Sequence, residues 1–195
     1  MKIFKFAVVF LCITCAIVFV VAATMIIKQN MTDISINDSI KSLTNNVKYK
    51  NPVKTETENI PEINIISAST NSGFYTEIKK QFPDYKITQY KNIKNSELLD
   101  KIYEALSNDI LVICRYAAAD NSETWAMDYC VITEIDIPGD KITVKDSNGY
   151  TETYAIKDFL KATRFEISEN MEFYLKLGFA AEIFTKNTVY IIEKN

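Results

Sequence analysis

The segment from Trp125 to Phe159 constrains the fold more than any other part of this chain. Three of its stretches alternate polar residues with Tyr, Val, Ile and Thr, a pattern that is typical of half-buried strands. Two turn signals separate the stretches: Pro138-Gly139-Asp140, and Asn148-Gly149, which favours a two-residue hairpin. The segment therefore predicts three antiparallel strands and a short helix, at residues 128–135, 141–145, 151–156 and 157–161.

The segments on either side predict the rest of an α+β domain built on an antiparallel sheet. Apolar residues recur at helical spacing over 74–82 and over 97–107. Ser72 can cap the first helix; Asn95 or Ser96 can cap the second, which Asn108 can end in a left-handed conformation. A continuous apolar run at 110–114 is typical of a central strand. Further strands are expected at 63–66, 85–90 and 188–192, whereas 171–177 is compatible with a helix or a strand.

The N-terminal part of the sequence predicts a membrane anchor. Residues 6–27 are 22 uncharged, mostly apolar residues that follow Lys2 and Lys5. About 20 such residues cross a bilayer as a helix, and the preceding lysines favour a cytoplasmic N-terminus. We therefore expect residues 1–28 to be a single-pass signal anchor, with the rest of the chain outside the cytoplasm. The alternative is a signal peptide cleaved near Val21-Ala22-Ala23, which would release a secreted domain.

Residues 29–61 are rich in Asn, Thr, Lys, Ser and Glu and contain few large apolar side chains. This composition predicts a polar linker, with a short amphipathic helix at 36–43 and an extended stretch at 47–61. The predicted domain then covers residues 62–195.

The chain has no histidine, and this absence limits its chemistry more than any other count. It excludes Ser-His-Asp triads, Cys-His pairs and histidine-containing zinc sites together. The four glycines form no phosphate-binding loop, since Gly139 and Gly149 are too far apart for one. Three of the 22 basic residues and none of the 25 acidic ones lie in residues 1–28, so the remainder is acidic. We expect no nucleic-acid partner, no metal and no cofactor.

The four cysteines form neither a disulfide framework nor a metal-binding spacing. Cys12 and Cys15 lie in the apolar run and are interpreted as small apolar residues. Cys114 and Cys130 lie in two predicted neighbouring strands, where buried apolar residues are expected. A disulfide between them is the alternative, and it would need a close, non-hydrogen-bonded pair.

The order of the predicted elements resembles the C-terminal half of the papain-like fold in bacterial C-39-like cysteine peptidases. In that family a helix and a buried strand lead to a His-Tyr-Val-Val-Val motif and then to an Asp-Pro-x-Gly motif. Here Asp128-Tyr129-Cys130-Val131-Ile132 stands at the place of the first motif, and Asp146-Ser147-Asn148-Gly149 at that of the second. The resemblance covers residues 62–194 and implies a papain-like antiparallel sheet with flanking helices.

The resemblance also implies where a catalytic site would lie, and the residues there have changed. The family's nucleophilic cysteine opens a helix, and Ser72 stands at that place. The catalytic histidine corresponds to Asp128, and the aspartate that would orient it corresponds to Asp146. An aspartate beside a thiol would raise its pKa, and a serine without a general base is a weak nucleophile.

These departures predict a degenerate, non-catalytic peptidase-like domain that is anchored in the membrane and binds a peptide or a protein partner. Two alternatives remain open. Asp128 and Asp146 would serve as the carboxylate pair of an unusual hydrolase. Otherwise, the chain would be a half-domain completed by a partner protein that supplies the nucleophile.

Overall fold

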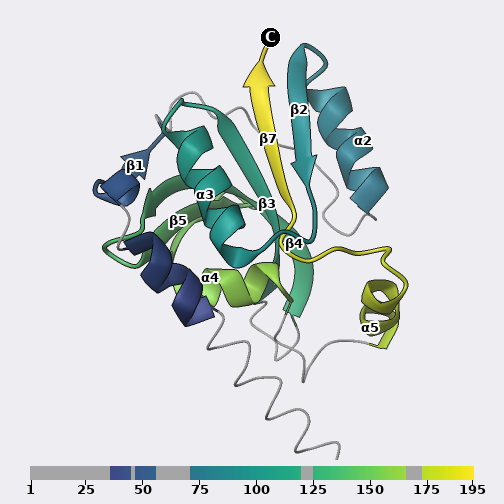
Figure 1. Ribbon diagram of the computed structural model, residues 1–195. Helices are drawn as coiled ribbons and strands as arrows, with labels where there is room; N and C mark the ends of the chain where they lie inside the picture. Colours follow the sequence, from purple (N-terminus) through teal and green to yellow (C-terminus); the bar gives the residue numbers. More distant parts are fainter. Residues whose placement is uncertain (1–35, 45–46, 56–70, 120–124, 166–172) are drawn as a thin grey trace, which may run out of the picture. The chain divides into compact units, whose positions relative to one another are not determined.

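A computed structural model describes residues 36–44, 47–55, 71–119, 125–165 and 173–195. The chain divides into two units, Met1–Asp38 and Ser39–Asn195. In the first unit, the described residues 36–38 are helical. In the second unit, residues 39–44 are helical, in agreement with the short helix expected there, and the elements labelled in Figure 1 follow.

Helices and strands of the second unit appear in an order that agrees closely with the sequence pattern. The elements are η1 (Val47–Tyr49), β1 (Val53–Lys54), α2 (Asn71–Gln81), β2 (Tyr85–Tyr90), α3 (Asn95–Leu106), β3 (Leu111–Ala119), β4 (Trp125–Asp136), β5 (Lys141–Asp146), β6 (Thr151–Ala155), α4 (Ile156–Thr163), α5 (Phe173–Ala180) and β7 (Val189–Lys194).

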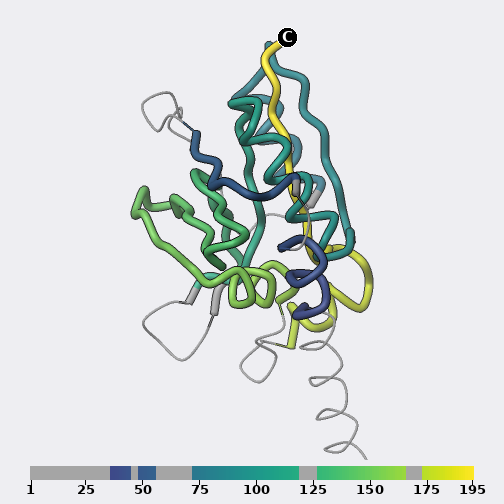
Figure 2. The backbone as a smooth tube through the Cα atoms, turned by 60° about the vertical axis from the view of Figure 1, so that its left-hand side comes forward, coloured from purple at the N-terminus to yellow at the C-terminus, as the bar shows by residue number. Residues whose placement is uncertain are grey.

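The seven strands form one antiparallel sheet in the order β2-β7-β3-β4-β5-β6, with β1 paired to β4. The α+β class expected from the sequence is confirmed. The predicted meander is β4, β5 and β6, joined by turns at the two predicted places. The strand order is not sequential, because β7 follows every other strand in the chain yet lies between β2 and β3 (Figure 1 and Figure 2).

Helices cover both faces of the sheet (Figure 1). On one face, Phe74 and Ile78 of α2 pack with Tyr129 and Tyr190 in a buried cluster that also contains Phe82, Ile113, Val131 and Ile192. Neighbouring strand residues point to opposite faces. Cys114, Cys130 and Ile132 therefore point to the other face, which α3 and α4 cover.

The predicted helix caps at α2 and α3 are wrong. Ser72 lies inside the first turn of α2 (Asn71–Gln81). α3 begins at Asn95, and its N-cap is Lys94, which makes no side-chain capping bond. Asn95 is buried instead and accepts a hydrogen bond from Asn187. The left-handed residue after α3 is Asp109, with a φ of 55°, rather than Asn108.

Part of the segment expected to be a linker joins the sheet, since Val53 and Lys54 of β1 pair with Ile135 and Glu134. The ambiguous segment near 171–177 is helical where described, as α5. The expected strand at 63–66 and the expected transmembrane helix at 6–27 lie outside the described residues. Among the residues that are described, no helix is long and apolar enough to cross a bilayer.

Candidate functional site

Asp128, a candidate site residue from the sequence, lies on β4 and is held by two hydrogen bonds. The Ser147 hydroxyl donates to Asp128 Oδ2 at 2.6 Å, and the Tyr129 backbone N–H donates to Oδ1 at 2.7 Å. Burial raises the pKa of the Asp128 carboxyl, and the two hydrogen bonds only partly offset this. The carboxylate thus acts as an acceptor that joins β4 to the turn after β5.

Asp146, the second candidate carboxylate from the sequence, organises the β5–β6 turn. Its Oδ1 accepts hydrogen bonds from the backbone N–H groups of Asn148 at 3.0 Å and Tyr150 at 2.7 Å. Its backbone N–H donates to the Tyr150 carbonyl at 2.9 Å. Gly149 has a φ of 88°, which a side chain would disfavour. Asp146 is therefore an Asx-type turn residue whose carboxylate is used by the turn itself.

The structure brings Asp128 and Asp146 into one region but places Ser72 elsewhere. Ser147, next to Asp146, bonds to Asp128, and the charge of Asp146 adds to the factors that raise the pKa of Asp128. Ser72 is an exposed residue of α2, the helix that packs on the face carrying Tyr129. Asp128 precedes Tyr129 and points to the opposite face. The three positions do not converge on one face of the sheet.

Cys114 and Cys130 are direct partners in the β3–β4 ladder, and both are free and fully buried. Burial raises the pKa of both thiols, so neither is a reactive thiolate. The Arg115 N–H donates to Thr188 on the β7 side of β3. The backbone of Cys114 consequently faces β4, and the two cysteines form a hydrogen-bonded pair. A disulfide between them would need a non-hydrogen-bonded pair, so this geometry disfavours the disulfide alternative.

Arg115 is a buried charge that the sequence reasoning did not single out. It is 1% exposed, its guanidinium lies 5.1 Å from the centre of the Phe74 ring, and it contacts the Met127 sulfur. Burial lowers its pKa, while the charge of Asp128 works in the opposite direction. The only available signal is that an arginine interrupts the apolar run after residue 110. Arg115 holds α2 against the sheet through its ring contact.

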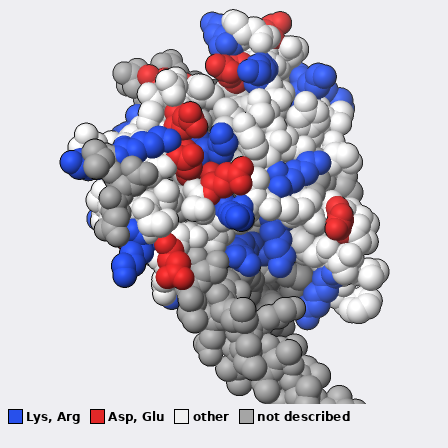
Figure 3. All heavy atoms as spheres, viewed as in Figure 1, with Lys and Arg blue, Asp and Glu red and all other residues white. Residues whose placement is uncertain are grey.

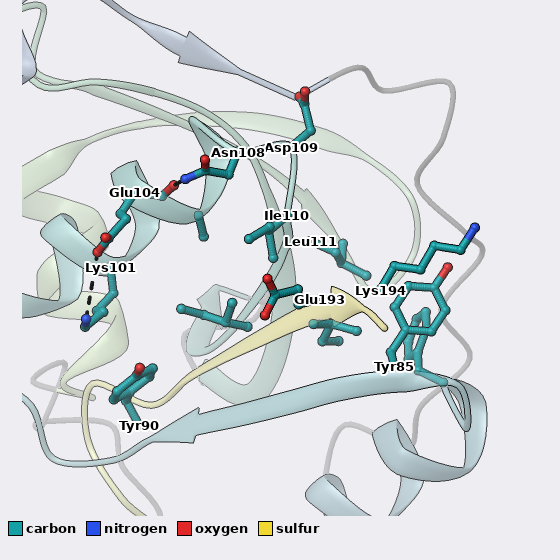
Figure 4. A pocket seen from close by; sticks show the side chains of 14 residues that line it. Tyr85, Tyr90, Lys101, Glu104, Asn108, Asp109, Ile110, Leu111, Glu193 and Lys194 are labelled. Carbon is teal, nitrogen blue, oxygen red and sulfur yellow. Dashed lines mark hydrogen bonds and ion pairs between the residues drawn. The ribbon is translucent and has the colours of Figure 1, made fainter.

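A groove of about 760 Å³ lies between α3 and the strands β2 and β7 (Figure 4). Its lining combines apolar side chains, such as those of Ile110 and Ile191, with polar and charged ones. It is lined by Phe82, Tyr85, Tyr90, Lys101, Glu104, Ala105, Asn108, Asp109, Ile110, Leu111, Ile191, Ile192, Glu193 and Lys194. None of Ser72, Asp128 and Asp146 lines this groove.

The polar residues of the groove are arranged along its length. At one end, the Lys101 ammonium lies 3.8 Å from the Glu104 carboxylate and 5.2 Å from the centre of the Tyr90 ring. Figure 4 shows the Glu193 carboxylate in the middle of the groove and Tyr85 at the other end. Glu193 also forms an ion pair with Lys86 at 3.5 Å. Acidic and basic side chains alternate over the same face in Figure 3.

No group of three or more His, Cys, Asp or Glu residues that could hold a metal ion occurs in the described parts of the chain. Comparison with known protein families finds no matching family, and a search of curated proteins finds no match either.

Proposed function

We propose that this chain is a membrane-anchored, extracytoplasmic relative of C-39-like peptidases that has lost catalysis and binds an extended peptide. The observation that carries the proposal is the groove between α3 and β7, whose lining combines apolar side chains with charged and polar ones. Peptide sites commonly have this composition, because apolar pockets hold side chains and polar groups fix the backbone.

The order of elements supports the family part of the proposal. A helix, a buried strand, a loop and a three-strand meander occur in the order that the resemblance implies. Asp128 and Asp146 lie on neighbouring strands, as the corresponding motifs would.

Three features support the loss of catalysis. The chain has no histidine to serve as a general base. Ser72 and Asp128 belong to opposite faces of the sheet, so they do not form a nucleophile–base pair. Asp146 uses its carboxylate to close a turn.

The charges of the groove indicate which peptides fit. Glu193 is central, and Glu104 and Asp109 add two acids, against Lys101 and Lys194. Lys101 is engaged by Glu104 and Tyr90, and Glu193 is paired with Lys86 at 3.5 Å in an exposed contact that a peptide cation would have to replace. A peptide that presents Lys or Arg between apolar residues would pair with Glu193 and place its apolar side chains against apolar lining residues such as Ile110 and Ile191.

An array of 15-residue peptides, probed with the full chain in detergent, tests the proposal. We expect selective binding of peptides with Lys or Arg among apolar residues, without hydrolysis. Glu193→Lys should weaken this binding at least tenfold, because it reverses the central charge. Glu152→Lys, an exposed residue of β6 outside the groove, is the matched control and should leave binding unchanged. Equal binding by both variants would contradict the groove assignment.

The carboxylate hydrolase remains a second candidate because Asp128 and Asp146 do lie in one region with a raised pKa at Asp128. Turnover of a peptide or glycan that disappears in Asp128→Asn would establish it and refute the non-catalytic proposal. The half-domain alternative predicts activity only after a nucleophile-bearing partner is added.

A further inference from the structure

Helix α5 exposes an apolar surface that the peptide-binding proposal does not use. Phe173 is 80% exposed, Tyr174 62%, Leu177 58%, and Ile183, just after the helix, 49%. The first three occur at helical spacing on one side of α5. These four residues form what we term the α5 patch.

The opposite side of α5 is already packed against the domain. Leu175 and Gly178 are buried, and Phe179 contacts the Phe165 ring at 4.9 Å and the Phe184 ring at 5.6 Å between centroids. A methyl group on Gly178 would lie 2.4 Å from the Phe184 ring, so the glycine allows this close contact. α5 is thus apolar on its inner and its outer side, although helices at a protein–water boundary are normally polar on the outer side.

The sequence indicates what covers the patch. The apolar run at 6–27 is expected to lie in a bilayer, and only the eleven residues 28–38 separate it from the second unit, which begins at Ser39. Fully extended, eleven residues span at most about 40 Å. The domain is therefore held at the bilayer surface, where an exposed apolar helix meets lipid at a high effective concentration.

The chemistry of the patch fits the region between headgroups and acyl chains. Phe, Tyr, Leu and Ile enter this region readily, and the exposed Lys176 can extend its ammonium toward the headgroups. The charge is not that of an anionic-lipid sensor. Glu166, Glu169, Glu172 and Glu182 outnumber Lys176 and Lys186 across 166–186. Apolar insertion, rather than attraction to anionic lipid, is the driving force.

We propose that the α5 patch inserts into the bilayer surface and orients the domain on the membrane. The proposal rests on the membrane anchor at 6–27 and is independent of what the groove binds.

The test uses the full chain in phosphatidylcholine vesicles whose acyl chains carry bromine, which quenches nearby tryptophan. Trp125, the only tryptophan, is replaced by Phe, and a new tryptophan is placed at Tyr174→Trp or, as the control, at Tyr150→Trp. Tyr150 is an equally exposed tyrosine, 71% accessible, in the β5–β6 turn. We expect the emission at position 174 to fall by at least half and that at 150 to stay unchanged.

Each other outcome decides against the proposal. Equal emission at both positions would overturn it, whether the chain is inserted or only mixed with vesicles. A blue-shifted but unquenched signal at 174 would show that protein, such as a second copy, covers the patch. Quenching that appears only with anionic phosphatidylglycerol would refute apolar insertion.

Leu177→Asp, a change at an exposed position, should relieve quenching at 174.

Discussion

Asp128 shows that a residue can match the position of a family motif without having the role of that motif. In the resemblance it stands for a catalytic base, yet its two oxygens accept hydrogen bonds from Ser147 and Tyr129. The sequence placed Asp128 and Asp146 on neighbouring strands correctly, because the meander pattern fixes both. It could not show that Ser72 belongs to the opposite face, since that depends on where α2 packs.

The sequence could not predict the contacts of Asn187 either, because they too depend on how distant segments pack. Asn187 has a φ of 43°, and its side-chain amide donates to the Ile93 carbonyl and to Asn95, while Thr163 donates to its oxygen. These partners are far apart in the sequence, so no local pattern predicts that Asn95 turns inward rather than capping α3.

The titration of Asp128 gives a prediction at this scale. Burial raises the folded-state pKa of Asp128 above its unfolded value of about 3.9. The folded state therefore binds the proton more tightly, and the native protein gains stability as the pH falls through the folded pKa toward 3.9. Asn at this position does not titrate. The free energy of unfolding of Asp128→Asn, relative to the native chain, should be highest at pH 8 and decline toward pH 4.

Urea unfolding of both proteins across this pH range measures the difference. A gap that does not change with pH would show that burial of Asp128 has no net effect on its titration.

Strand and helix positions were largely predictable at the scale of elements. Local periodic patterns predicted three elements directly. β5 and β2 form where residues alternate at 141–145 and 85–90, and α3 forms where apolar residues recur over 97–107. β1 was missed because two paired residues carry no periodicity. Its place on β4 depends on a distant partner.

The β3–β4 pair leads to a prediction about thiol chemistry. Cys114 and Cys130 are free, fully buried and have raised pKa values, so both should resist alkylation in the folded protein. We expect iodoacetamide to label neither in native conditions and both in denaturant, with the same mass before and after reduction. Labelling counted on the peptides that contain Cys114 and Cys130 excludes a contribution from Cys12 and Cys15. A gain in mass of two hydrogen atoms on reduction would reveal a disulfide.

The whole molecule depends on β7, and proline substitutions test this dependence. Ile191 pairs with Thr88 of β2 and with Val112 of β3, so a proline there removes a ladder hydrogen bond inside the sheet. Ile191→Pro should lower the free energy of unfolding by at least about 1–3 kcal/mol, because a buried carbonyl loses its partner.

A matched proline on the sheet edge is the control. In the β5–β6 ladder, the Asp146 N–H bonds to the Tyr150 carbonyl, so the backbone of residue 150 faces β5 and that of Thr153 faces away. Thr153→Pro should therefore cost less than Ile191→Pro, because it removes no ladder hydrogen bond. Thermal unfolding of both variants gives the comparison. Equal losses of stability would mean that β7 does not lie inside the sheet between β2 and β3.

Strand order is the part of the fold that the sequence left open. The terminal apolar strand was expected in the sheet, but period and turn signals describe neighbours in the chain, whereas the insertion of β7 between β2 and β3 is a long-range event.

That insertion also sets the timing of folding. Gln89 of β2 and Tyr190 of β7 are hydrogen-bonded across 101 positions of sequence. When the chain emerges from its N-terminal side, β2 is made early, yet it pairs with β7 and cannot join the sheet until β7 arrives. Strands so far apart in the sequence pair slowly. The chain loses conformational entropy when the long loop closes, before the contacts between the strands stabilise it. During this delay, the apolar face of α2 and one edge of β3 remain open to aggregation, and the newly made chain needs protection until β7 has joined the sheet.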